Sequence, residues 1–162
     1  MDISENTRWS TELQLMKLSH DFAYCMDYMR YEELVQLFTP DALLDRILHV
    51  HRGHAEILAG LQARPTQIVT RHVSTNFHYS HVDDNTAKGV VYNISYFGPL
   101  NATADLPVLY GSPQGMLLEF HDVYRRTGQR WLFSQRIARP VLLPQDSPMF
   151  KAKTWRASEI AG

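Results

Sequence analysis

Four long stretches typical of β-strands fill the second half of the chain. They are rich in Val, Ile, Tyr and Phe, which favour strands. The stretches are residues 70–79, 86–97, 116–126 and 131–143. Turn signals at residues 82–85 and 127–130 join neighbouring stretches over short distances. The pattern predicts strands joined mainly as hairpins, and therefore a mostly antiparallel sheet.

The first half of the chain is expected to be mainly helical. Residues 9–30 contain no Gly or Pro, and their apolar side chains recur at helical spacing. Residues 31–38 are predicted to form a second, short helix that stops before Pro40, because the residue before a proline disfavours helix. A strand over residues 42–50 and a third helix over residues 54–63 are expected next.

This order predicts an α+β fold in which the helices lie against one face of a curved sheet. A sheet that curls around helices forms a cone with a cavity at its mouth. The length of 162 residues predicts a single domain over residues 1–162, with a core at about 10–143 and a tail at 144–162. The connection over residues 98–115 is long and rich in Gly and Pro, as lids and partner contacts often are.

Charge and composition narrow the possible partners. The net charge is -1 and no Lys or Arg block occurs, so binding to nucleic acid or to an anionic membrane is not expected. No apolar run is long enough to span a bilayer, and no signal peptide precedes the first helix. The lone Cys25 excludes an intramolecular disulfide. These features predict a cytoplasmic protein.

The strand over residues 70–79 carries the main candidate for chemistry. Its residues alternate between two sets, one bulky (Val73, Thr75, Phe77, Tyr79) and one small or polar (His72, Ser74, Asn76, His78). A polar face without Lys or Glu is typical of a recessed wall where a ligand binds, rather than of a solvated surface. His72 is therefore expected to face a cavity.

Asp27 is the expected partner of His72. It lies beside the apolar stripe of the first helix, so its carboxylate should point inward. An imidazole can take a proton from carbon or oxygen, and a buried carboxylate can fix its tautomer and stabilise the imidazolium. We expect the two side chains to lie within hydrogen-bond reach in one cavity. A pair that merely holds helix to sheet is the alternative.

Several short motifs, in this order, carry a family likeness. Asp27 is followed by LFTPDA, RGHAEI, RHVSTN and HDVYRR, which begin at residues 37, 52, 71 and 121, and by Gly128 and Trp131. The set, over about residues 10–143, resembles the SnoaL-like branch of the nuclear transport factor 2 superfamily. That family includes scytalone dehydratase, hexachlorocyclohexane dehydrochlorinase, polyketide cyclases and the β subunits of ring-hydroxylating dioxygenases.

The resemblance implies roles for the candidate pair. In the dehydratase and dehydrochlorinase members a histidine on this strand acts as base, and an aspartate late in the first helix orients it; His72 and Asp27 match these positions. Three positions depart from scytalone dehydratase: Asn93 replaces a second histidine, and Met26 and Arg46 replace the tyrosines that hold water. A scytalone substrate is therefore not expected. Members usually associate through the sheet, so a homo-oligomer, a dimer or trimer, is expected.

The other candidates are binding residues. Asn93 and Asn76 are possible hydrogen-bond donors to a substrate oxygen, or alternatively satisfy the local backbone. The further substrate-binding candidates are Met26, Phe38, Phe97 and Phe120. A metal site is not expected, because the clustered histidines have no matching third carboxylate or Cys ligand; these are His49, His51 and His54. No phosphate loop or dinucleotide motif occurs, so no cofactor is implied.

The sequence does not determine which face of the sheet His121 lies on. His121 is a second possible acid if its strand register turns it inward, and Arg136 and Arg139 are expected to be surface or interface charges.

The sequence supports two kinds of function. The first is a cofactor-independent lyase or isomerase for a small hydrophobic, cyclic substrate, with His72 as base and Asp27 as its orienter. The second is a non-catalytic module, either like a dioxygenase β subunit or simply ligand-binding. A filled cavity or a large catalytic partner would favour the subunit, and turnover that depends on His72 would favour the enzyme.

Overall fold

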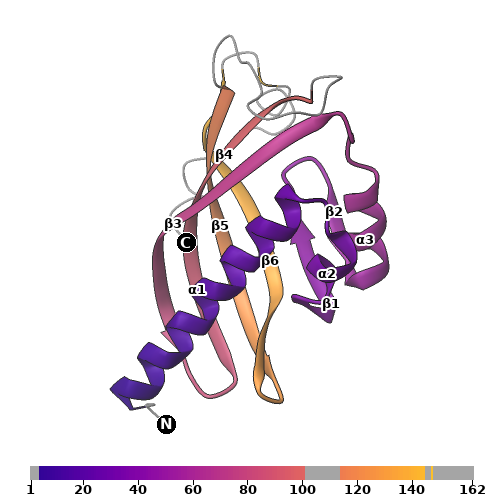
Figure 1. The fold of residues 1–162 in the computed structure, drawn as a ribbon. Coiled ribbons are helices and arrows are strands. Elements are labelled where there is room, and N and C mark those ends of the chain that lie inside the picture. Colours follow the sequence, from indigo (N-terminus) through magenta and orange to yellow (C-terminus); the bar gives the residue numbers. More distant parts are fainter. Residues whose placement is uncertain (1–3, 101–113, 145–146, 148–162) are drawn as a thin grey trace.

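The computed structural model describes residues 4–100, 114–144 and 147 (Figure 1). The elements in these residues are α1 (Glu5–Asp27), α2 (Tyr31–Val35), β1 (Phe38–Asp45), β2 (Val50–Arg52), α3 (Gly53–Gln62), β3 (Ile68–Val82), β4 (Thr86–Pro99), β5 (Gln114–Thr127) and β6 (Arg130–Leu142). Most of the predicted 98–115 connection and of the predicted tail lies outside the described residues. None of the described helices is long and apolar enough to cross a membrane.

The sheet has the strand order β2-β1-β6-β5-β4-β3. The strands β3 to β6 are antiparallel neighbours, whereas β1 runs parallel to β6. α1 crosses one face of the curved sheet, and α2 and α3 lie beside β1 and β2 (Figure 1). The sheet is open, with β2 and β3 as its edge strands. The predicted α+β architecture, with helices against a curved and mostly antiparallel sheet, is confirmed.

α1 supplies one side of the core. It begins at Glu5, earlier than predicted, and Ser4 caps it by accepting a hydrogen bond from the Thr7 backbone N–H at 3.3 Å. The buried stripe agrees with the predicted helical spacing: Leu15, Leu18, Phe22 and Cys25. The helix ends at Asp27, which is the residue that enters the site.

The predicted strand over residues 42–50 is wrong at both ends. The strand β1 already begins at Phe38, so α2 ends at Val35 instead of reaching residue 38. Pro40 is tolerated inside β1 because the pairing with β6 shifts register around it. β1 then stops at Asp45, whose carboxylate accepts a hydrogen bond from the backbone of Ile47, a residue with a φ of 74°. That turn separates β1 from β2.

β3 changes its inward face at Asn76. This residue has a φ of 50°, and the pairing with β4 shifts register beside it, as in a β-bulge. Before the bulge His72 and Ser74 face inward; after it Phe77 and Tyr79 pack on the core. The extra residue reverses the alternation, so the prediction that all the bulky residues share one face is wrong.

Arg136 is fully buried, although the sequence predicted a surface charge. It donates to its cross-strand neighbour Asp122 from Nε at 2.9 Å and from Nη2 at 2.7 Å, and Nη2 also donates to Ser19 Oγ at 2.9 Å. The hydroxyl of Tyr124 donates to the same carboxylate at 2.8 Å. The guanidinium lies 3.9, 4.4 and 4.5 Å from the ring centroids of Phe133, Phe120 and Phe22 respectively.

The sheet face turned away from α1 carries a row of apolar side chains. Direct cross-strand pairing connects Val73, Ile94, Leu117 and Leu142 across β3, β4, β5 and β6. Val73 is 49% exposed and Leu142 is 64% exposed, and Tyr96, beside the row, is 46% exposed. A continuous apolar strip on a sheet surface is typical of an interface.

We expect this strip to join copies of the chain into a dimer or trimer. Light scattering on the wild-type protein should return a multiple of the 18.7 kDa chain mass. Glutamates at Val73 and Leu142 should reduce it to one chain, because charges desolvated at an interface without partners oppose association. Leu13→Glu, on the exposed side of α1, is the matched control that should not change the mass. A monomeric wild-type protein would contradict this expectation.

Candidate active site

A cavity of about 300 Å³ opens between the end of α1, the turn after β1 and the inner face of β3 to β5. Most of its lining is apolar, including Phe22, Met26, Phe97 and Phe120. This volume is at the small end of ligand-binding pockets, which suits a ligand of one or two rings. A few polar side chains interrupt the apolar wall, and His72 is one of them.

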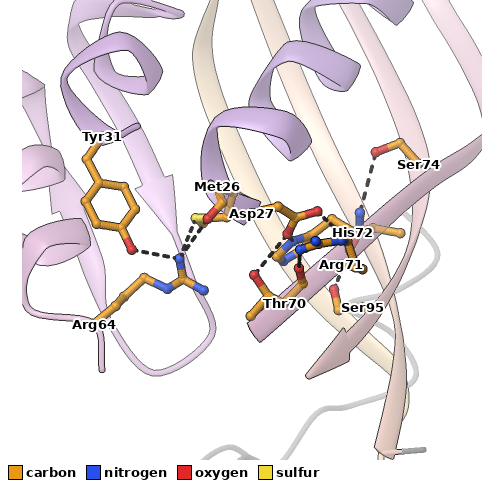
Figure 2. Close-up of polar contacts among 10 residues, drawn as sticks. Met26, Asp27, Tyr31, Arg64, Thr70, Arg71, His72, Ser74 and Ser95 are labelled. Atoms are coloured by element: carbon orange, nitrogen blue, oxygen red, sulfur yellow. Dashed lines mark hydrogen bonds and ion pairs between the residues drawn. The ribbon is translucent and has the colours of Figure 1, made fainter. Parts of the chain in front are cut away.

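The structure brings His72 and Asp27 together. Asp27 Oδ1 accepts a hydrogen bond from His72 Nδ1 at 2.5 Å and another from the hydroxyl of Thr70 at 2.9 Å (Figure 2). Its Oδ2 accepts one from the backbone N–H of His72 at 2.9 Å. The side chains of Asp27 and His72 are only 7% and 12% exposed. The last residue of α1 is thereby fixed to the first part of β3.

The Asp27 carboxylate stays ionised in spite of its position. Burial acts to raise its pKa, and a helix C-terminus also disfavours a negative charge. The hydrogen bonds and charge of His72, with the hydroxyl of Thr70, outweigh burial and hold the Asp27 pKa below its ordinary value. These interactions therefore compensate for placing a carboxylate where the helix opposes it.

Asp27 also fixes which nitrogen of His72 is available. An ionised carboxylate can only accept hydrogen bonds, so the proton of the neutral imidazole is assigned to Nδ1. Nε2 then carries the lone pair. Because His72 lines the cavity and its Nδ1 is held by Asp27, Nε2 is the atom available to a bound ligand.

A set of hydrogen-bonded polar side chains lies next to His72 on β3 and β4. Ser95 is the cross-strand partner of His72 and also lines the cavity. Its hydroxyl donates to Asn93 Oδ1 at 2.6 Å, and Asn93 Nδ2 donates to Ser74 Oγ at 3.4 Å. Asn93 is 1% exposed, and both ends of its amide are used by the protein. Of the three hydrogen-bonded residues Ser95, Asn93 and Ser74, Ser95 is therefore the one that lines the cavity.

The other predicted binding residues divide between the cavity and its surroundings. Met26, Phe97 and Phe120 line the cavity, and their role in binding stays a prediction. Phe38 lies one layer deeper, 1% exposed, with its ring packed on Phe133. Asn76 is exposed at the bulge and does not line the cavity.

The remaining candidate histidines lie elsewhere. His121 is on the outer face of the sheet, opposite the buried Phe120, and its Nε2 forms a hydrogen bond with Glu119 Oε2 at 3.0 Å. The ring of His54 bonds the Phe38 carbonyl at 2.9 Å. Within the described part of the chain no group of three His, Cys, Asp or Glu residues is placed to hold a metal ion.

Sequence reasoning missed four polar residues of the cavity wall: Asp45, Arg64, Thr70 and Ser95. Thr70 and Ser95 share the inward strand phase of His72 and Asn93, so alternation could have indicated them. Asp45 and Arg64 lie beside turns, where no periodicity predicts the direction of a side chain.

An α+β cone with a histidine–carboxylate pair inside its cavity defines the class of protein, and comparison with known proteins gives the family. The model of the SnoaL-like domain matches residues 7–137. The chain therefore belongs to the SnoaL-like family, as the resemblance of its motifs predicted. The search of curated proteins finds no match.

Solved structures share the fold at low sequence identity. A proposed scytalone dehydratase from Novosphingobium aromaticivorans is 16% identical, with a TM-score of 0.74 over 95% of both chains. ActVI-ORFA from Streptomyces coelicolor is 16% identical, with a TM-score of 0.67 over 81% of this chain and 97% of that one. A hexachlorocyclohexane dehydrochlorinase, LinA type 2, is 16% identical, with a TM-score of 0.66 over 90% and 98%. Identities this low establish the fold alone.

Proposed function

We propose that this protein is a cofactor-independent lyase or isomerase that acts on a small hydrophobic, cyclic substrate. One observation carries the proposal: His72, held by Asp27 at 2.5 Å, lines a cavity that is otherwise mostly apolar. A histidine with one nitrogen fixed by a buried carboxylate and the other available is arranged for general acid–base catalysis.

The proposed chemistry begins with proton abstraction from carbon. Nε2 of His72 takes a proton from a carbon next to a carbonyl or a leaving group. The electron pair of the broken C–H bond then forms a double bond, and either a leaving group departs with its own electron pair or an enolate forms. The imidazolium, stabilised by Asp27, returns the proton to the leaving group or to another carbon.

Two solved structures with this fold support the choice of reaction type. Their names describe a proposed scytalone dehydratase and a hexachlorocyclohexane dehydrochlorinase. Both names describe eliminations, which remove a proton and a leaving group from adjacent atoms. The same cavity is also compatible with plain ligand binding, whereas the subunit alternative with a filled cavity is disfavoured by the 300 Å³ of open volume.

Deuterium exchange tests the proposal without knowledge of the natural substrate. Small cyclic ketones, and alcohols or chlorides that can undergo elimination, are incubated with the protein in D2O and followed by NMR. We expect faster incorporation of deuterium, or faster elimination, for at least one compound, and we expect the acceleration to disappear in His72→Gln. Acceleration that persists in His72→Gln would reject the proposal.

Asp27→Asn should lower turnover by roughly ten- to a thousand-fold, because an adjacent opposite charge stabilises the charged form by one to three pKa units. Substrate affinity should change little.

The folded Asp27→Asn protein should also lose stability near neutral pH, since the Asp27 pKa is lowered on folding. That contribution is present above the ordinary pKa of 3.8 and is lost as the pH falls through the lower folded value. Initial rates and urea unfolding at several pH values measure both effects.

A further inference from the structure

Two arginines line the same cavity as His72. Arg46 follows the end of β1, and Arg64 follows α3. Arg46 Nη1 donates to the Gly60 carbonyl at 3.0 Å. Arg64 Nη1 donates to the hydroxyl of Tyr31 at 3.0 Å and to the Met26 carbonyl at 3.3 Å (Figure 2).

These bonds anchor one corner of each guanidinium and leave donors unused. Within the described residues, all the hydrogen bonds that either side chain donates come from Nη1. In this part of the chain, no group accepts a hydrogen bond from Nε or Nη2 of either arginine, so these donors are available to a ligand. A planar guanidinium offers these N–H groups in a fixed fork that suits a carboxylate.

Within the described part of the chain, the two cations also lack a negative partner. Among the described residues neither arginine forms an ion pair, whereas Arg8, Arg30, Arg125 and Arg136 each pair with a carboxylate. Burial, and then repulsion from Arg64, lower the pKa of Arg46. Two like charges close together in a partly buried wall are unfavourable without a compensating anion.

The carboxylates near the cavity are already engaged. Asp27 accepts hydrogen bonds from Thr70 and His72. Asp45 also lines the cavity, and its Oδ1 accepts a hydrogen bond from the backbone N–H of Ile47 at 2.8 Å. Tyr31 acts in the opposite direction to burial and Arg64, and raises the pKa of Arg46.

We infer that Arg46 and Arg64 form a carboxylate-binding subsite, and that the ligand of this cavity is a small ring compound carrying a carboxylate. The apolar wall takes the ring, the two arginines take the carboxylate, and His72 faces the remaining part of the ligand. The inference deepens the proposed function by naming the substrate class. Its catalytic meaning rests on that function, but the binding subsite does not require turnover.

The first test uses the unmodified protein and pairs of compounds that differ in charge. Benzoate is compared with benzamide, and 1-naphthoate with 1-naphthamide, by isothermal titration calorimetry. Each amide has nearly the shape of its acid but no negative charge. We expect the acid of at least one pair to bind about tenfold or more tightly than its amide, the scale of hydrogen bonds to a charged group. Equal affinity in both pairs, or no binding of either acid, would overturn the inference.

The second test assigns the preference to the two arginines. Arg46→Gln and Arg64→Gln should each reduce the preference for the acid, and the double variant should abolish it. Arg46→Lys and Arg64→Lys retain the charge and should keep part of it. Arg126→Gln changes an exposed arginine far along β5 and is the matched control. A preference that persists in the double variant would contradict the assignment.

His72→Ala separates this inference from the proposed function. It should keep the preference for the acid, since the carboxylate contacts the arginines rather than the imidazole. Acid binding together with no His72-dependent reaction would remove the catalytic proposal and leave the subsite intact. His72-dependent exchange of neutral compounds, with no preference for acids, would do the reverse.

Discussion

Replacing His72 by alanine should lower turnover by about 10²- to 10⁴-fold, the usual contribution of a positioned general base. The expectation follows from the cavity, where the available nitrogen of His72 is the described group best placed to take a proton from a bound ligand. Ligand binding should largely survive, because most of the cavity wall is apolar and remains in place. Single-turnover rates and dissociation constants measured side by side separate the two effects.

His78→Ala is the matched control for this experiment. His78 lies on the same strand but beyond the bulge, where its side chain is exposed. Its replacement should leave turnover unchanged. Comparable turnover in His72→Ala under saturating substrate would show that the pair with Asp27 is architectural and that the chain only binds its ligand.

Arg136→Met should destabilise the fold by about 3–5 kcal/mol, the cost of leaving one member of a buried ion pair without its partner. The reason is the full burial of Arg136 and its two hydrogen bonds to the equally buried Asp122. The variant also removes the cation that lies over the faces of three phenylalanine rings. Urea unfolding followed by far-UV circular dichroism measures the change.

A double variant distinguishes the uncompensated charge from lost packing. Arg136→Met combined with Asp122→Asn removes both charges and keeps an oxygen that can accept the hydrogen bond of Tyr124. It should recover part of the lost stability. Arg130→Met, at the exposed start of the same strand, should have little effect. A loss of under about 1 kcal/mol in Arg136→Met, the scale of an exposed ion pair, would contradict the description of a buried pair.

This charged core also supports the cavity. Phe22 and Phe120 contact the guanidinium of Arg136 with their ring faces and also line the cavity. We therefore expect ligand affinity to fall in Arg136→Met even at temperatures where the variant remains folded, because two wall residues lose the group on which they pack.

Local sequence patterns predicted the elements that have a clear period or turn. The apolar stripe of α1 and the alternation in β4 are continuous, so periodicity indicated both. The inward positions of His72 and Asp27 followed from the same periods. Their approach to 2.5 Å depends on how α1 crosses the sheet, and a single sequence carries little information on that crossing.

The predictions from sequence failed for side chains whose position depends on a long-range strand pairing or on an irregular turn. Arg136 was taken for a surface residue because an arginine is rarely buried, and its partner Asp122 is brought beside it only by the β5–β6 register. Asp45 and Arg64 were missed as wall residues for a related reason. Their directions depend on the turns after β1 and α3, which have no periodicity.

The bulge at Asn76 divides β3 into two parts that face different regions of the protein. Residues before it meet the ligand cavity, and residues after it fill the core. Because one added residue sets the phase on each side, substitutions in the first part can alter what is bound without disturbing the packing of the second. Removing this single residue would exchange the inward-facing and outward-facing side chains of one part of β3 relative to the other part. The bulge thus allows the ligand-facing residues of β3 to vary in sequence while the core-packing residues of the same strand stay apolar.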